Sequence, residues 1–202
     1  MKIALMLEGK TERAFLVHLR EFLEQHLAGN MPKLDPVPYD GRIPKGEKLK
    51  RHVMLLLSGP RAADHVIALT DVYTGSHPPD FRDAEEAKAK MKAWVGSEPR
   101  FHPHAAQYEF EAWLLPYWPT VQQLTGSNKN APAGNPETVN HNHPPSFHLS
   151  EAFRSGKSKY IKARDASRIL AVNNLYVAIH QCTELKSFIN TILSLSGGKL
   201  IS

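Results

Sequence analysis

Two acidic residues follow the most apolar runs of this sequence, where their carboxylates could bind a divalent metal ion. Glu8 comes directly after the run Ile3–Leu7, and Asp71 comes directly after the run 65–70. Both runs have the length and composition of buried strands. In parallel sheets, ligands bind beyond the carboxyl ends of the strands, so both side chains are expected at one edge of a sheet.

A second acidic pair, Glu109 and Glu111, flanks Phe110. In a strand the two carboxylates would share a face. In a helix they would lie about 200° apart, and one would have a structural role alone. Magnesium and manganese prefer oxygen ligands, and two to four such carboxylates would hold one or two ions. Two ions about 4 Å apart can activate a water and stabilise the leaving oxygen in phosphodiester cleavage.

An acidic residue after a strand also has a plain structural explanation. The N-terminus of a helix favours negative charge, so Glu8 could serve only as a partner of the helix that follows it. Glu12, one turn further on, is expected to be a solvated or capping residue.

A basic stretch near the C-terminal third could contact phosphates. It contains Lys157, Lys159, Lys162, Arg164 and Arg168, with Tyr160 among them. Cationic side chains around an aromatic ring suit a phosphate backbone and a stacked base. The alternative is a solvated helix start. Separately, His141, His143 and His148 have a spacing that can bind zinc, or else belong to a polar loop.

The elements that would position these residues alternate between strands and helices. Strands are expected at 3–7, 65–70 and 100–107, and an edge strand or loop at 34–39 because it holds two prolines. Helices are expected at 11–27, 48–57, 84–95, 109–115, 163–170, 174–179 and 182–195. This alternation predicts an α/β fold with a mostly parallel sheet flanked by helices.

The chain divides into three parts by composition. Residues 1–125 are expected to form the α/β core. Residues 126–148 are rich in Asn, Pro, Gly and His and are expected to be a flexible loop or insertion. Residues 149–202 are expected to form a helical C-terminal part packed on the same domain.

Length and charge narrow the class of protein further. The 202 residues suit one domain, and no apolar run reaches the roughly 20 residues that span a bilayer. The first residues are too short an apolar run for a signal peptide, and the single Cys182 excludes an intramolecular disulfide, so the cytoplasm is expected. The net charge of +5 agrees with a polyanionic partner such as nucleic acid.

Several short motifs, taken in order, resemble those of a known group of proteins. Residues 8–12 read EGKTE and resemble the E-G-x-T-E opening of Toprim-like proteins. Residues 71–73 with 79–81 resemble the D-Y-Y-G-L-P…F-P-G stretch of one uncharacterised family in that group. Residues 107–115 resemble its H-E-F-E-A-L-L segment. Residues 158–162, then Cys182 and Phe188, are similar to its Y-x-K and C-x-x-F region.

The resemblance implies a Toprim-type fold and metal-dependent cleavage of nucleic acid, related to the nuclease domains of overcoming-lysogenization-defect-type proteins. It implies Glu8 as general acid/base, with Asp71 beside it in the catalytic site as a metal ligand. Together with the second acidic pair, the expected ligands of magnesium or manganese are Glu8, Asp71, Glu109 and Glu111. It further implies an ABC-type ATPase subunit as partner in bacterial anti-phage systems. The residues expected to contact nucleic acid are Lys10, Lys159, Tyr160, Lys162 and Arg164.

The sequence departs from this pattern at two positions. Tyr73 stands where Toprim domains carry the second acid of D-x-D, and Tyr108 stands in place of a histidine. Glu109 or Glu111 could supply the missing oxygen. Three functions therefore stay open: a nuclease subunit, a non-catalytic binding or regulatory subunit of an ATPase, and a transferase or phosphatase for small phosphorylated molecules. A homo-oligomer is possible for each.

Overall fold

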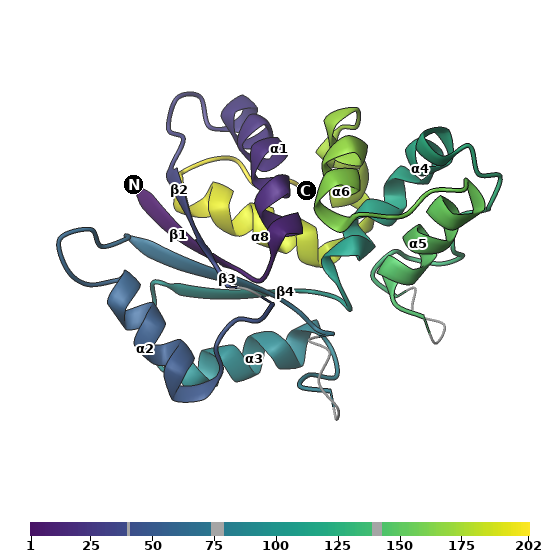
Figure 1. The fold of residues 1–202 in the computed structure, drawn as a ribbon. Coiled ribbons are helices and arrows are strands. Elements are labelled where there is room, and N and C mark those ends of the chain that lie inside the picture. The colour runs from purple at the N-terminus through teal and green to yellow at the C-terminus, as the bar shows by residue number, and fades with distance from the viewer. Residues whose placement is uncertain (40, 74–78, 139–142) are drawn as a thin grey trace.

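A four-stranded parallel sheet forms the centre of the protein, in the order β2-β1-β3-β4 (Figure 1). The computed structural model describes residues 1–39, 41–73, 79–138 and 143–202. The strands are β1 Lys2–Leu7, β2 Lys33–Pro38, β3 His65–Asp71 and β4 Phe101–Ala106. The central strands β1 and β3 are apolar along almost their whole length because both of their faces are covered.

Helices cover both faces of the sheet. Helices α2 and α3 lie on one face, and α1 and α8 lie on the other (Figure 1). Their bounds, with those of the remaining helices in the described residues, are α1 Lys10–His26, α2 Gly46–Leu56, α3 Ala84–Val95, the 3₁₀ helix η1 Phe110–Tyr117, α4 Trp118–Thr125, α5 Pro145–Ser155, α6 Lys162–Ala171, α7 Leu175–Gln181 and α8 Thr183–Leu195. None of the helices in the described ranges is long and apolar enough to cross a membrane.

Strand alternation divides the core into two layers. Ile3 and Leu5 of β1 pack in the layer with α1 and α8, whereas Ala4 and Met6 pack in the layer with α2 and α3. The first layer also contains side chains of α5, α6 and α7. The C-terminal helices therefore share one core with the sheet.

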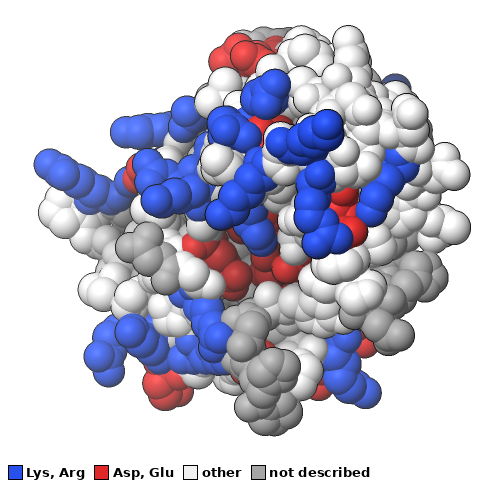
Figure 2. Space-filling view, turned by 45° about the vertical axis from the view of Figure 1, so that its right-hand side comes forward, with Lys and Arg blue, Asp and Glu red and all other residues white. Residues whose placement is uncertain are grey.

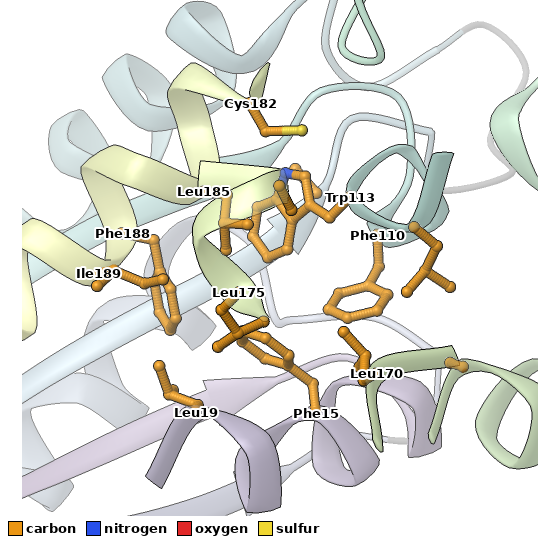
Figure 3. Close-up of a cluster of buried hydrophobic side chains, with 14 of the residues drawn as sticks. Phe15, Leu19, Phe110, Trp113, Leu170, Leu175, Cys182, Leu185, Phe188 and Ile189 are labelled. Atoms are coloured by element: carbon orange, nitrogen blue, oxygen red, sulfur yellow. The ribbon is translucent and has the colours of Figure 1, made fainter. Parts of the chain in front are cut away.

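An aromatic cluster in the first layer fixes η1 against α1 and α8 (Figure 3). The ring of Phe110 lies 5.4 Å from that of Phe15 and 5.3 Å from that of Trp113. Trp113 in turn stacks on Phe188 of α8, with 6.2 Å between the ring centroids. Because both neighbours of Phe110 in the chain are glutamates, this packing also determines where their carboxylates point.

Prolines occupy the outer edges of the sheet. The N–H groups of Lys33 and Tyr39 donate to β1, so the alternating Pro36 and Pro38 face away from it. On β4, Pro103 likewise lies on the outward side, because the flanking even-numbered carbonyls accept from β3. No hydrogen bond of the sheet is lost at these positions, because the N–H group that proline lacks would have pointed away from the neighbouring strand.

The predicted α/β fold class is confirmed, and the predicted edge position of β2 is observed. The helix expected at 109–115 is instead the 3₁₀ helix η1, which continues through Pro116 directly into α4. Helix α4 was not predicted, nor was the start of α5 at Pro145, inside the segment expected to be a loop. Both helices begin with proline in the first turn, where its fixed φ suits a helix and no N–H is needed.

The proline- and asparagine-rich segment is attached to the core where the structure describes it. Asn135 Nδ2 donates to the carbonyl of Gln181 at 3.0 Å. Glu137 accepts from Trp113 Nε1 at 3.0 Å and from the N–H of Glu184 at 3.0 Å, which caps the first turn of α8. A buried carboxylate in this segment thus links η1 to α8.

We predict that Gly156→Ala destabilises the protein. A Cβ at Gly156 would lie 1.9 Å from the backbone carbonyl oxygen of Thr125, so α5 would have to move away from the end of α4. We expect a loss of about 2 kcal/mol or more in the free energy of unfolding, measured by urea denaturation. The neighbouring exposed Ser155→Ala is the control and should change it by less than about 0.5 kcal/mol. Equal midpoints for both variants would contradict the contact.

Candidate active site

A cavity of about 500 Å³ opens at the C-terminal ends of β1 and β3. Glu8, Gly9, Lys10, Thr11, Glu12, Gly41, Asp71, Phe110, Glu111, Ile161, Lys162 and Ala163 line it. Figure 2 shows acidic side chains at the bottom of a hollow, with lysine and arginine side chains crowded along its rim. The expectation that Glu8 and Asp71 meet at one edge of the sheet holds.

Glu8 is buried and held in one orientation. Its Oε1 accepts from the Thr70 hydroxyl and, at 3.5 Å, from the N–H of Ile43. Burial raises the pKa of Glu8 to about 7, although these hydrogen bonds oppose the shift. A carboxyl with such a pKa can accept or release a proton near neutral pH, which suits general acid/base chemistry.

Asp71 ends β3 and faces a concentration of negative charge. Its Oδ1 accepts from the N–H of Phe110 at 2.9 Å, which ties β3 to η1. Burial, and then the charges of Glu12, Glu8 and Glu111, raise the pKa of Asp71 well above its ordinary value. The cluster is therefore short of positive charge.

Glu12 belongs to the site, although the sequence led us to expect a solvated or capping role. It is 6% exposed and lines the cavity, so the solvated alternative is wrong. Its carboxylate does cap α1, because it accepts from its own N–H and from that of Gly9. The signal was its position in the sequence, since Glu12 lies in the first turn of α1, which begins just beyond the end of β1 where Glu8 lies.

The pair Glu109 and Glu111 separates into two roles. Glu109 Oε2 accepts from the N–H of Ser146, in the first turn of α5, at 3.0 Å. Glu109 is not among the residues that line the cavity. Glu111 is 1% exposed and does line it. Glu109 is the extended residue that precedes η1, whereas Glu111 lies in the first turn of η1, so the backbone turns between the two side chains.

Only one of the two carboxylate oxygens of Glu111 has a hydrogen-bond partner in the described part of the chain. Its Oε2 lies 3.3 Å from Lys162 Nζ, and its buried Oε1 has no hydrogen-bond partner among the described residues. Burial raises the pKa of Glu111 to about 7, although the Lys162 ammonium opposes the shift. A buried carboxylate oxygen without a donor is the kind of atom that a cation would satisfy.

The predicted nucleic-acid contacts lie at different distances from the site. Lys10 and Lys162, in the first turns of α1 and α6, line the cavity. Lys159 is exposed and lies three residues before Lys162 in the sequence. Arg164 forms an ion pair of 2.8 Å with the buried Asp165, so its guanidinium is anchored to its own helix.

Tyr160 cannot stack on a base in this structure. It is 8% exposed, and its ring packs on Phe153 with 5.3 Å between centroids. Burial and then the nearby Glu111 raise the pKa of its hydroxyl above the ordinary range. The predicted stacking role is therefore wrong: the aromatic residue of the basic stretch is a core residue that supports η1 and α6.

The two departures from the Toprim-like pattern lie against each other. Tyr73 donates its N–H to the carbonyl of Tyr108 at 2.7 Å, and the two rings lie 5.1 Å apart. Tyr108 has φ of 65°, the left-handed region that few side chains adopt. An aromatic pair thus occupies the place where the resemblance implies an acid and a histidine.

A divalent ion fits the donor set, although no ready-made ligand group is present. Within the described residues, no three His, Cys, Asp or Glu side chains are placed so as to hold a metal as they stand. Burial, and then the charges of neighbouring carboxylates, raise the pKa of Glu8, Asp71 and Glu111, so a bound cation would favour their charged forms. Magnesium keeps several waters and needs only one or two direct carboxylates, so water-bridged binding is compatible with this geometry.

Among the described residues, His143 and His148 belong to no group of side chains that could hold a metal ion. His143 stacks on Phe147 with 4.0 Å between the rings, and the expected zinc ligand His141 lies outside the described residues.

Comparisons with known proteins identify a family and a fold. The family described as "Domain of unknown function (DUF4276)" matches residues 7–193. The C-terminal region of the Burkholderia pseudomallei OLD protein is 13% identical, with a TM-score of 0.53 over 96% of this chain and 98% of that chain. The C-terminal region of the Xanthomonas campestris pv. campestris OLD protein is 14% identical, with a TM-score of 0.48 over 96% of each chain. No curated protein matches significantly.

We predict a characteristic pH dependence of stability in the metal-free protein. The pKa of Glu8 rises from 4.5 to about 7 on folding, so the folded state binds more protons between these values. Its contribution to stability is complete below about pH 4.5 and is lost as the pH rises through 7. In chelator, Glu8→Gln should therefore gain stability relative to wild type between pH 5 and 8, as measured by thermal denaturation.

The exposed Glu24→Gln, on the same helix as Glu12, is the control for this measurement. Its difference from wild type should stay constant across the pH range. A constant difference for Glu8→Gln as well would mean that the Glu8 carboxyl is not desolvated.

Proposed function

We propose that this chain, which belongs to the DUF4276 family, is a nuclease that cleaves phosphodiester bonds with the help of magnesium or manganese. The observation that carries the proposal is the cavity at the strand ends. Four carboxylates and two lysines line it, and one of the carboxylates has a buried oxygen for which the described part of the chain offers no donor. Carboxylates that hold cations, beside lysines that bind phosphates, match the needs of phosphodiester cleavage.

Glu8, Glu12, Asp71 and Glu111 would hold the ion, and a bound ion would polarise the phosphate and offset the charge that develops on it. The chain's own residues supply the rest. Glu8, oriented by Thr70, is placed to move a proton to or from the reacting oxygen. Lys10 and Lys162 are placed to draw phosphate oxygens toward the carboxylates.

The partners follow from the sequence resemblance and from charge. The net charge of +5 and the basic rim favour nucleic acid as substrate (Figure 2). An ABC-type ATPase subunit, a role in anti-phage defence and a cytoplasmic location belong to the same proposal. They rest on the resemblance in the order of motifs.

A non-catalytic binding subunit is the second candidate. Tyr73 in place of an acid favours it, as does the lack of a ready-made three-ligand group in the described ranges. Such a protein would bind nucleic acid or an ATPase without metal, and Asp71→Asn would leave that binding unchanged.

We predict metal-dependent cleavage that requires the residues of the cavity. Supercoiled plasmid, single-stranded DNA and RNA are incubated with magnesium, manganese or chelator, and product is followed on gels. Glu8→Gln, Asp71→Asn and Glu111→Gln should each lower the rate by about a hundredfold or more. Glu109→Gln is the matched control and should keep most of the rate, because its side chain is turned toward α5. Full activity in Glu8→Gln and Asp71→Asn would refute the proposal.

We also predict that Gly9→Ala weakens metal binding without unfolding the protein. A Cβ at Gly9 would lie 3.0 Å from Glu12 Oε2 and would displace that carboxylate. Because the supporting contacts of a ligand typically affect affinity by 10- to 100-fold, we expect manganese to bind about tenfold more weakly by calorimetry. Glu24→Gln should bind as wild type does. Unchanged affinity in Gly9→Ala would exclude Glu12 from the metal site.

A further inference from the structure

Lys162 stands inside the acidic cluster rather than at its border alone. Its Nζ lies 3.3 Å from Glu111 Oε2, and Glu111 is 1% exposed while the lysine side chain is 53% exposed. The lysine stem thus reaches in from the surface and brings the ammonium to a buried carboxylate.

The influence of Lys162 is uneven across the cluster. Its ammonium contacts a carboxylate oxygen of Glu111. Glu8 instead accepts from the Thr70 hydroxyl and the N–H of Ile43, and Asp71 accepts from the N–H of Phe110. Among the described contacts, Glu111 therefore has a positively charged partner, whereas Glu8 and Asp71 have uncharged hydrogen-bond donors.

From this asymmetry we infer that Lys162 takes the place of a second metal ion, so that the site binds one divalent cation. The inference rests on the proposed function, because it concerns the same site. Two divalent ions would add a charge of +4 to four carboxylates and a lysine. One ion together with Lys162 supplies +3, which nearly balances four carboxylates.

The position of Tyr73 agrees with this arrangement. Tyr73, two residues beyond the end of β3, packs on Tyr108 and supplies no carboxylate there. Of the four carboxylates that line the cavity, Glu111 already has a lysine ammonium on one of its oxygens. The two features are independent in sequence, and both reduce the number of divalent cations that the cavity can hold.

The test is the stoichiometry of manganese binding by calorimetry on the whole chain, which does not depend on activity. Wild type should bind one ion. Lys162→Met keeps most of the stem but removes the charge, and it should bind a second ion or bind the first about tenfold more tightly. Lys162→Arg keeps the charge and should bind one ion with nearly unchanged affinity.

Each outcome has one meaning. Two ions in wild type would overturn the inference and leave the proposed nuclease intact. Unchanged stoichiometry and affinity in Lys162→Met would also overturn it, provided that thermal denaturation shows the variant to be folded. If Lys162→Met fails to fold, Lys162→Gln takes its place. No binding in either protein would refute the metal dependence of the proposed function, and the inference with it.

Discussion

Mutual repulsion among carboxylates at the strand ends is the constraint on which the rest of this structure depends. Like charges brought together in a poorly solvated cavity raise one another's pKa, and each group needs a donor to stay in place. Here Glu8 takes a hydroxyl, Asp71 a backbone N–H and Glu111 an ammonium. None of these contacts neutralises the cluster as a whole, so the carboxylates could still bind a cation.

The core provides the rigidity that this state requires. Phe110 packs between Phe15 and Trp113, and its N–H donates to Asp71. One residue thereby joins the aromatic core to the acidic cavity, and its two glutamate neighbours are forced to opposite sides. The helix α6, packed on α1, brings Lys162 across to the carboxylates from a distant part of the chain.

Sequence patterns could predict the sheet and part of the site, for identifiable reasons. Apolar runs with acids at their ends place Glu8 and Asp71 correctly, because strand direction alone decides where those side chains meet. The patterns could not separate Glu109 from Glu111, since that depends on where the 3₁₀ helix begins, which is between the two residues. They also misjudged Tyr160, because a tyrosine among lysines has the same pattern whether its ring is exposed or packed on Phe153. The sequence did not assign Glu12 to the site because an acid in the first turn of a helix is explained by a capping role alone. The structure shows that the side chain also lines the cavity.

The prolines at the sheet edges bear on how this protein can assemble. Pro36, Pro38 and Pro103 remove donors from the outward sides of β2 and β4, where a strand of another chain would need them. Strand addition is a common way for sheets to join, and it is also the common route to uncontrolled aggregation. The prolines therefore disfavour strand addition at both edges, and they favour contacts of a partner, or of a second copy of this chain, through helical faces and loops. They also lower the tendency of the sheet to extend into the sheet of a neighbouring molecule.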